Sequence, residues 1–348
     1  MHAETSDKFS DERLQARLAD FLRSEGAEDP RIGRLRRYTA GFSWITYELE
    51  AAWRDGKGRH ERDLILRIGP DNGLFAPYTA RPEFIALSCL KPAGVPLPTV
   101  RWFCDDREVL GAPFLIYDRI EGEAPLPWSS GGEPFDDGLR KRLGKEFVAV
   151  LSALHRFDWR DTGAHELPGP ETEADAAPAQ IRTWEGWLRQ WSERSFPMLE
   201  WALLWLKRNA PPAPRITLVH GDYRIGNFLH VNGRITGILD WELVHRGDPH
   251  EDLGWVCLRA FRGRSPYMCH LVSRDELCRR YAELTGMPVS AQALHYYELF
   301  GAFKLAVIHL GASYCFERRG NDDLRMALFG AQMPRLLLQL ERLMDGSS

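Results

Sequence analysis

The chain has 348 residues, a length that corresponds to about two domains of ordinary size. Hydrophobic residues make up 44% of it and charged residues 27%, which is typical of a soluble globular protein. The net charge of −4 excludes a general electrostatic attraction to nucleic acid or to a membrane, so any anionic partner must be held by a local cluster of arginines.

The six cysteines form no CxxC pair, and residues 1–15 are polar and of mixed charge, unlike a secretion signal. We therefore expect a reduced, cytoplasmic protein without disulfides. The most apolar late stretch, residues 301–312, is interrupted by Lys304 and His309. This stretch is too short to span a bilayer.

The first part of the chain predicts a small α+β unit of about 120 residues. Leucines recur every four residues after Ser10, which predicts an amphipathic helix ending at Gly26. The β-type sequence that follows turns at Ala40-Gly41 and continues in strands around Thr46–Trp53 and Asp63–Gly69, so we expect an antiparallel meander. A helix and two further strands complete the unit, at residues 80–91, 95–104 and 112–120.

The character of the sequence changes to helices from Asp137 onward. Three helices are predicted at residues 139–157, 181–196 and 198–210, and a loop rich in Pro, Gly and acidic residues separates the first two. Two or three more helices are expected after residue 250. We therefore predict two domains, residues 1–121 and residues 122–348.

The segment Leu218–Glu242, LVHGDYRIGNFLHVNGRITGILDWE, has polar residues at the ends of two apolar runs. Asp222 ends the first run, Asn227 follows it, and Asp240 ends the second run after the tight-turn signal Asn232-Gly233. A hairpin-like pair of strands would place these three side chains near one end. Two carboxylates and an amide oxygen suit a hard cation such as Mg²⁺, with one carboxylate left over as a base. A buried polar network in an ordinary hairpin is the alternative interpretation.

The spacing H-G-D-x-x-x-x-N, followed by a strand and an aspartate, is similar to the catalytic segment of kinases. Over nearly its whole length the sequence resembles the aminoglycoside phosphotransferase family, kinase-like enzymes that phosphorylate small molecules. The segment HGDYRIGN is most similar to the branch of kinase-like domains fused to, or encoded beside, acyl-CoA dehydrogenases. The resemblance implies a two-lobed, protein-kinase-like α+β fold. In that fold a small N-terminal lobe with an antiparallel sheet and one main helix binds nucleotide, and a larger helical lobe carries the catalytic loop and the acceptor site.

The resemblance also implies a role for each polar residue of the segment. Asp222 would be the catalytic base that accepts the proton of the substrate hydroxyl, and Asn227 and Asp240 would bind Mg²⁺. His220 would brace the loop. Asp252, at a predicted helix start, is expected to have a structural role and to help anchor this loop.

The first domain must supply a cation for the phosphates of ATP and an acidic partner that holds this cation. Arg67 lies in the strand where most kinases have a lysine, and the nearest lysines are Lys57, in the preceding turn, and Lys91. A guanidinium suits phosphate oxygens, although a solvated strand arginine is the alternative. Glu83, in the helix that follows, is the expected partner of Arg67, and an exposed helix glutamate is the alternative.

The remaining nucleotide contacts have weaker support in the sequence. Gly41, Phe42 and Ser43 are the candidates for covering the phosphates, although a glycine-rich fingerprint is absent. The backbone between Asp118 and Ile120 is expected to meet adenine as the hinge between domains, an assignment that rests on the resemblance. The expected cofactors are ATP and Mg²⁺, with ATP against GTP left open, and the protein is expected to be a monomer or a homodimer.

The acceptor is expected to be a small hydroxyl compound that is amphipathic or anionic. Residues 121–348 contain 27 Lys and Arg against 30 Asp and Glu, which is too weakly acidic for a polycationic aminoglycoside. Arg224, inside the catalytic segment, adds a cation near the acceptor or else braces the loop through a salt bridge. A set of tryptophans lines the acceptor pocket or only packs between helices: Trp184, Trp187, Trp191, Trp201 and Trp205.

A hydroxylated acyl-CoA or a hydroxy acid is therefore the leading expectation for the substrate. Two alternatives remain open at this point. One is a kinase that phosphorylates aminoglycosides or other antibiotics. The other is a nucleotide-binding module without catalysis, which is suggested by the arginine at position 67 and by the weak glycine loop.

Overall fold

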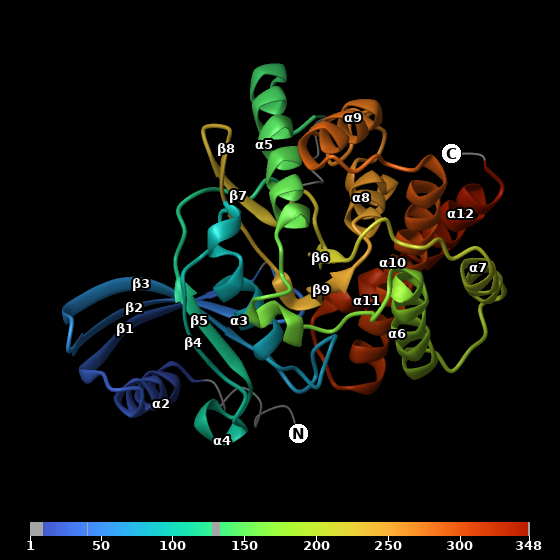
Figure 1. Cartoon of the computed structure of the whole chain (residues 1–348). Coiled ribbons are helices and arrows are strands. Elements are labelled where there is room, and N and C mark those ends of the chain that lie inside the picture. The colour runs from blue at the N-terminus through green and yellow to red at the C-terminus, as the bar shows by residue number, and fades with distance from the viewer. Residues whose placement is uncertain (1–9, 40, 127–132, 347–348) are drawn as a thin grey trace. The chain divides into compact units, whose positions relative to one another are not determined.

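The computed structural model describes residues 10–39, 41–126 and 133–346, and the chain forms two compact units (Figure 1). The first unit comprises Met1–Ser88 and Pro98–Arg119, and the second comprises Cys89–Leu97 and Ile120–Ser348. The main crossing from one unit to the other therefore follows Arg119, next to the predicted boundary at residue 121. In addition, the short segment 89–97 belongs to the second unit.

A five-stranded antiparallel sheet forms the first unit, with strand order β1-β2-β3-β5-β4. The elements of this unit are α2 (Asp11–Ser24), β1 (Glu28–Tyr38), β2 (Ile45–Asp55), β3 (Gly58–Ile68), α3 (Arg81–Cys89), β4 (Val100–Cys104), α4 (Arg107–Leu110) and β5 (Phe114–Asp118). The predicted meander and the two later strands are thus confirmed. Between β4 and β5, where only a turn was expected, Asp106 caps the short helix α4 by accepting a hydrogen bond from the N–H of Glu108 (2.9 Å).

Buried side chains alternate with more exposed ones along the strands, so the two faces of this sheet differ. Along β2 every second side chain is buried, from Tyr47 to Trp53, and this face packs with the leucines of α2 in one apolar core. In β3 the core side chains Leu66 and Ile68 flank Arg67, so Arg67 projects from the opposite face. The sheet thereby presents a charged group away from its apolar core.

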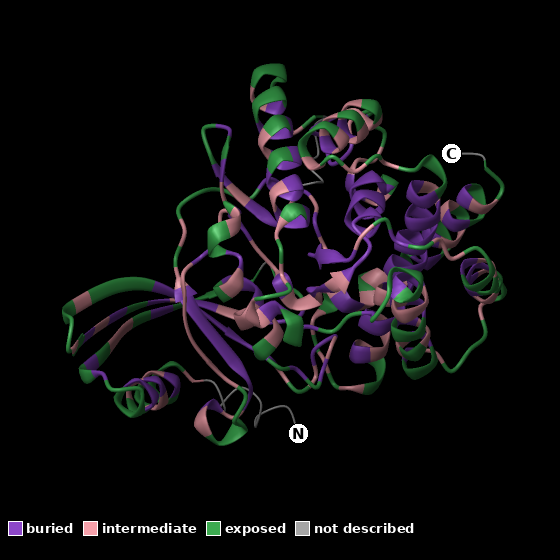
Figure 2. Cartoon of the chain, viewed as in Figure 1, coloured by how far each residue is buried: buried purple, intermediate pink, exposed green. Residues whose placement is uncertain are grey.

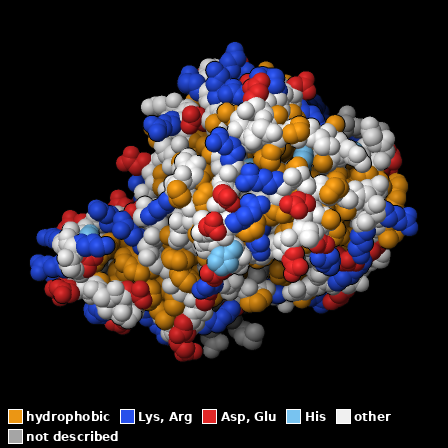
Figure 3. Space-filling model, viewed as in Figure 1, with side chains coloured by type: hydrophobic (Ala, Val, Ile, Leu, Met, Phe, Trp, Pro, Cys, Tyr) orange, Lys and Arg blue, Asp and Glu red, His pale blue; other side chains and the backbone are white. Residues whose placement is uncertain are grey.

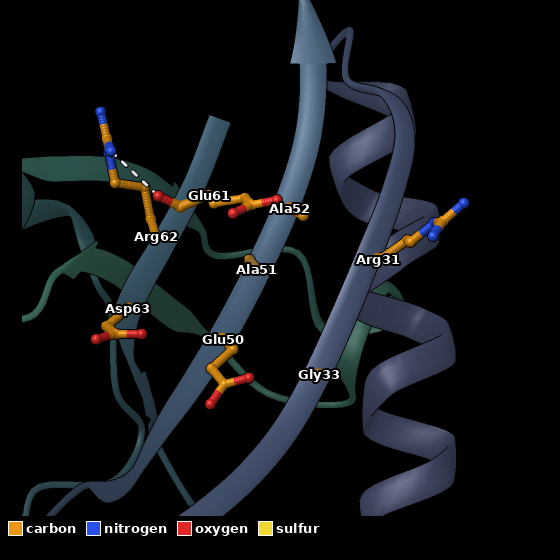
Figure 4. A pocket seen from close by; sticks show the side chains of 8 residues that line it. All are labelled: Arg31, Gly33, Glu50, Ala51, Ala52, Glu61, Arg62 and Asp63. Atoms are coloured by element: carbon orange, nitrogen blue, oxygen red, sulfur yellow. Dashed lines mark hydrogen bonds between the residues drawn. The ribbon is translucent and has the colours of Figure 1, made fainter. Parts of the chain in front are cut away.

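A shallow groove runs along β1, β2 and β3 (Figure 4). Its floor includes the small residues Gly33 and Ala52, and its walls carry charges of both signs. None of the residues predicted from the sequence to have a functional role lines this groove.

The second unit is mostly helical. Its α-helices are α5 (Asp137–Arg156), α6 (Ala176–Trp191), α7 (Pro197–Arg208), α8 (His250–Cys257), α9 (Arg274–Thr285), α10 (Ala291–Arg318), α11 (Leu324–Ala331) and α12 (Met333–Met344). Short 3₁₀ turns lie at η1 (Lys91–Ala93), η2 (Gly163–Glu166), η3 (Glu173–Asp175), η4 (Trp241–Leu243) and η5 (Arg259–Phe261). The three predicted helices are present, but within the described residues five α-helices, rather than two or three, begin at residue 250 or later.

Helix α10 is the central helix of this unit. With 28 residues it is long and apolar enough to cross a membrane by length and composition, because the helix extends well beyond the apolar run 301–312. However, 78% of its most apolar window is buried inside the protein (Figure 2). Its apolar character is therefore accounted for by packing in the core.

Four short strands lie within or next to the segment Leu218–Glu242: β6 (Thr217–Val219), β7 (Phe228–Val231), β8 (Arg234–Ile238) and β9 (His245–Gly247). The predicted pairing of the first apolar run with the second is wrong, because β6 pairs with β9 and β7 pairs with β8. The turn Asn232-Gly233, with φ of 51° and 88°, joins β7 to β8. A two-residue turn can only join strands that are adjacent in sequence, and β7 was not recognised as a strand.

Candidate active site

Asp222 lies in the loop between β6 and β7, and three side chains hold its carboxylate. Oδ1 accepts hydrogen bonds from Trp255 Nε1 (2.7 Å) and from Arg224 Nε (2.8 Å). Oδ2 accepts a hydrogen bond from Asn227 Nδ2 (2.6 Å). Nevertheless 19% of the side chain remains exposed. The carboxylate is thus fixed in direction while part of it stays accessible.

Asn227 is buried and contacts Asp222 directly, as the spacing predicted. Its Nδ2 also donates to the backbone oxygen of Asp222 (3.0 Å), so the amide nitrogen is used within the loop and Oδ1 is the atom left for a further ligand. The backbone oxygen of Asn227 accepts from the N–H of Leu239 (2.9 Å). Asp240, the next residue, has a left-handed backbone (φ 61°, ψ 58°) and follows the end of β8 rather than lying within it.

The donor set offered by Asn227 and Asp240 consists of oxygens, which Mg²⁺ prefers. Among the described residues no cluster of three or more His, Cys, Asp or Glu side chains could hold a metal ion. A magnesium ion at these two residues would therefore depend on water and on substrate oxygens for its other ligands. This is the usual arrangement for Mg²⁺ in nucleotide-dependent enzymes.

Asp252, in the first turn of α8, anchors the loop that carries Asp222. Its Oδ2 accepts from the backbone N–H of His220 (2.8 Å), and its Oδ1 accepts from that of Gly221 (2.9 Å). His155 Nε2 on α5 donates to Oδ2 as well (3.1 Å). Burial alone would raise the pKa of Asp252, but the hydrogen bond and charge of His155, with His220, lower it overall. The carboxylate is ionised and fully buried, and it binds the loop rather than capping its own helix.

Gly221 is required by the shape of this loop. Its φ of 82° lies in the left-handed region, and a Cβ atom would stand 2.7 Å from the backbone oxygen of Leu243. Any other residue would therefore strain the backbone and push against the η4 turn. The glycine of the HGD segment thus lets the chain turn sharply between the anchored His220 and the partly exposed Asp222.

His220 braces the loop as a neutral imidazole. Its Nδ1 accepts from the N–H of Asp222 (3.1 Å), and its Nε2 donates to the backbone oxygen of Leu239 (2.9 Å). The ring also packs against Trp241 at a centroid distance of 4.5 Å. Burial lowers the pKa of His220, more than the nearby carboxylates raise it. Protonation would place a proton on Nδ1, where the hydrogen bond from Asp222 is now made.

The lowered pKa of His220 predicts a specific pH dependence of stability. Since the folded-state pKa lies below the unfolded value of about 6.5, the contribution is present above that pH and is lost as the pH falls through the folded-state pKa. Urea unfolding at about pH 7.5 and 5.5 should show that the wild type loses more free energy of unfolding than His220→Gln. Equal losses in the two proteins would contradict a neutral, buried His220.

Arg224 contacts Asp222 directly. Besides the ion pair with Asp222, its Nη1 donates to the backbone oxygen of Ile225 (3.0 Å), and its guanidinium lies 5.3 Å from the centroid of the Phe261 ring. The salt-bridge alternative is therefore the arrangement that the structure contains. Arg224 braces the loop and is only partly exposed.

Arg67 and Glu83, in the first unit, form a buried ion pair. Nη1 of Arg67 lies 2.7 Å and 2.9 Å from the two carboxylate oxygens, and both residues are only 3% exposed. The guanidinium also lies 5.4 Å from the centroid of the Trp44 ring. The expected pairing is present, and neither alternative, a solvated arginine or an exposed glutamate, describes these residues.

The residues predicted to cover phosphates differ from one another. Phe42 is exposed (37%), whereas Ser43 is buried and its backbone oxygen accepts from the hydroxyl of Tyr78 (3.0 Å). A Cβ atom at Gly41 would stand 3.4 Å from the backbone oxygen of Trp44. Position 40 lies outside the described residues, so the predicted Ala40-Gly41 turn is described only from Gly41 onward.

The predicted hinge between Asp118 and Ile120 already makes several hydrogen bonds within the protein. The carboxylate of Asp118 forms a bidentate pair with Arg101 (2.8 and 2.7 Å), and the N–H of Asp118 donates to the oxygen of Thr99 (2.9 Å). The side chain and the N–H of Asp118 are therefore occupied. Adenine would therefore be bound here by backbone carbonyls and by the N–H of Ile120.

The tryptophans of the second unit divide between core and surface. Trp184 and Trp191 are buried, and Trp191 stacks on Trp187 with centroids 4.5 Å apart. Trp201 is 50% exposed. Trp184, Trp187 and Trp191 therefore pack between helices, which is one of the two alternatives given for the tryptophans.

Two contacts of the site were missed from the sequence. Trp255, three residues after Asp252 on α8, donates to Asp222, and His155 of α5 completes the environment of Asp252. The segment GDPHEDLGW gives only one hint: helical spacing puts its last residue on the same side of α8 as Asp252. No local signal marks His155, because its contact joins residues 97 positions apart.

Comparisons with known proteins identify the family of this chain. Residues 34–284 match the model of the phosphotransferase enzyme family. Acyl-CoA dehydrogenase family member 10 of Mus musculus is 30% identical over 295 residues, covering 80% of this chain and 26% of that protein. Acyl-CoA dehydrogenase family member 11 of Homo sapiens is 26% identical over 335 residues, covering 91% of this chain and 41% of that protein. The chain thus spans only 26% and 41% of the length of these relatives.

Solved structures share the fold. A candidate aminoglycoside phosphotransferase of Ralstonia eutropha JMP134 has a TM-score of 0.72 at 21% identity, covering 95% of this chain and 98% of that one. Macrolide 2′-phosphotransferase MphH of Brachybacterium faecium has a TM-score of 0.54 at 21% identity, covering 90% and 97%. The streptomycin–ATP complex of APH(2″)-IIa has a TM-score of 0.56 at 16% identity, covering 87% and 90%. These similarities confirm the predicted kinase-like α+β fold, and with the family match over residues 34–284 they place this chain in the phosphotransferase enzyme family.

Proposed function

We propose that this phosphotransferase uses ATP and Mg²⁺ to phosphorylate a hydroxyl group of a small anionic molecule. The observation that carries the proposal is the environment of Asp222, whose carboxylate is aimed by three donors and stays partly exposed. A carboxylate held in this way can accept a proton from a bound hydroxyl.

In the proposed reaction Asp222 accepts the hydroxyl proton while the substrate oxygen bonds to the γ-phosphorus of ATP. The bond from that phosphorus to the bridging oxygen breaks, and ADP leaves. Asn227 and Asp240 would hold Mg²⁺, which supplies positive charge against the phosphate oxygens. His220 keeps the loop in place, and Arg224 orients the base.

In the first unit, Arg67 would bind phosphate oxygens, with Glu83 holding its guanidinium in place. Gly41, Phe42 and Ser43 would cover the phosphates. The backbone carbonyls near Asp118 and the N–H of Ile120 would contact adenine. Support for ATP comes from the fold shared with APH(2″)-IIa, which was solved with ATP bound.

The buried pair Arg67 and Glu83 leads to a stability prediction. Glu83→Gln removes the carboxylate that pairs with the buried guanidinium of Arg67, so it should lower the free energy of unfolding by about 3–5 kcal/mol. The double variant Arg67→Met/Glu83→Gln removes both charges and should recover most of that loss, while ATP binding stays weak. Urea unfolding and ATP titration of both variants test this. Normal ATP affinity in the stable double variant would remove Arg67 from the nucleotide site.

An anionic acceptor is supported by the arginines of the segment whose Phe261 packs near Trp255. The Phe261 ring lies 5.2 Å from that of Trp255, which donates to Asp222, and Arg224 lies over Phe261. Around Phe261 the sequence LRAFRGR carries three arginines, none of which has a carboxylate partner within the described part of the chain: Arg259, Arg262 and Arg264. Phe261 itself is buried, and the three arginines give the segment around it a positive charge.

A hydroxyacyl-CoA or a hydroxy acid fits this chemistry better than a polycation. On the face shown in Figure 3, Lys and Arg side chains are interspersed with Asp and Glu, and the acidic side chains form no continuous surface. The names of the curated relatives, acyl-CoA dehydrogenase family members, support acyl-CoA compounds as the class to test first.

Acceptor-dependent ADP release tests the proposal. The purified protein is incubated with ATP and Mg²⁺ and with hydroxyacyl-CoAs, hydroxy acids, amino sugars or aminoglycosides, with a reaction lacking acceptor and one containing EDTA as controls. We expect release with an anionic acceptor and none with EDTA. Activity confined to aminoglycosides would identify an antibiotic kinase instead. ATP binding without any transfer would favour a non-catalytic module.

A further inference from the structure

A lysine is buried behind the catalytic loop. Lys304 lies on α10 and is 1% exposed. Its ammonium donates to the backbone oxygen of Gly221 (2.6 Å) and to Glu251 Oε1 (3.1 Å). The same nitrogen lies over two indole rings, at 4.9 Å from the centroid of Trp255 and 5.2 Å from that of Trp184.

The charge of Lys304 is compensated in the core. Glu251 accepts from Lys304 through one oxygen and contacts His245 Nε2 through the other (3.1 Å). Burial alone would raise the pKa of Glu251, but the charges of His245 and Lys304 lower it overall. A well-packed apolar side chain in place of such a buried pair is often as stable or more stable. Stability alone therefore does not explain a lysine at this position of an apolar helix.

The contacts of Lys304 lead to Asp222 by two routes. The carbonyl of Gly221 belongs to the peptide bond whose nitrogen is that of Asp222, so Lys304 fixes the plane of that peptide. The Trp255 ring, with the ammonium over its face, donates through Nε1 to Oδ1 of Asp222. A cation on the face of an indole attracts the ring and restricts its position. One ammonium thus constrains both the backbone and the hydrogen-bond donor of the base.

We infer that Lys304 is a positioning residue for phosphoryl transfer, which aligns Asp222 through Gly221 and Trp255. The inference rests on the proposed role of Asp222 as the base. Lys304→Met keeps most of the length of the side chain and removes the ammonium. Because small misplacement of a reacting group can cost on the order of a hundredfold in rate, we expect kcat to fall roughly tenfold to a hundredfold. The KM for ATP should stay unchanged.

A double-mutant cycle separates this role from a general loss of stability. If Lys304 acts through Trp255, Lys304→Met should cost markedly less kcat in a Trp255→Phe protein than in the wild type, because coupled residues are not additive. Val307→Ala, one turn farther along the buried face of α10, is the matched control. It should lower the melting temperature without changing kcat.

Hydrogen exchange supplies a readout that does not depend on activity. In Lys304→Met the amides of residues 218–228 should exchange faster, while the rest of the second unit and the Val307→Ala control should not show this local change. Should Lys304→Met fail to fold, the charge-neutral variant Lys304→Met/Glu251→Gln takes its place. Unchanged exchange in this segment, or additive effects of Lys304→Met and Trp255→Phe on kcat, would overturn the inference. A wild type without any transfer would overturn the proposed function instead.

Discussion

Asp222→Asn is expected to lower kcat roughly a hundredfold to ten-thousandfold, the usual cost of losing a general base. The asparagine oxygen can still accept the hydrogen bonds from Trp255 and Arg224, so the loop should keep its shape. ATP binding should therefore persist. The measurements are acceptor-dependent ADP release and the affinity for ATP in the presence of Mg²⁺.

The control for this experiment is an aspartate of the same unit without a role in the site. Asp137→Asn, at the exposed start of α5, should keep full turnover. Near-normal phosphoryl transfer by Asp222→Asn would show that another group accepts the proton, and the assignment of Asp222 would then be wrong.

Asp252→Ala is expected to have a large effect on stability. The substitution leaves two buried backbone N–H groups, those of His220 and Gly221, and one imidazole N–H of His155 without an acceptor. Removing one partner of a buried charged network costs about 3–5 kcal/mol. Urea unfolding should show a loss of that size, and activity should fall with it because the loop loses its anchor.

Asp252→Asn provides the comparison. Its amide oxygen can still accept one or two of these hydrogen bonds, so it should lose less stability than the alanine variant. If both variants unfold at the same urea concentration as the wild type, Asp252 does not anchor the loop, and the order of the HGD segment must depend on other contacts.

Contacts that are local in sequence could be predicted, and contacts between distant segments could not. Asp222 and Asn227 are only five positions apart, so a tight loop after the first strand is enough to bring them together. Arg67 and Glu83 belong to a strand and the helix that follows it, so their pairing could also be expected. By contrast, Trp255 is 33 positions from Asp222, and Lys304 is 83 positions from Gly221.

The incorrect strand pairing has a related cause. The sequence shows where apolar runs begin and end, but β6 pairs with the three-residue strand β9, which is too short to show a period of alternation. Similarly, Lys304 could be seen to interrupt an apolar helix, but only the fold shows that its ammonium reaches the loop from behind. Which strands pair, and whether a single polar side chain is buried, depend on tertiary contacts. The periodicity of apolar residues in the sequence does not show these contacts.

The anchoring of the loop by Asp252 bears on how members of this family can diverge. One carboxylate ties the loop to α5, to α8 and, through the hydroxyl of Tyr281 that contacts His155 (2.9 Å), to α9. The loop therefore shares the cooperative stability of the helices around it and is not an independent flexible segment. In the stretch around η5, by contrast, Arg259 and Arg264 are exposed and can be exchanged at little cost to that stability. Under the proposed function, new acceptors would be acquired by substitution at these positions while the loop that carries Asp222 keeps its anchor.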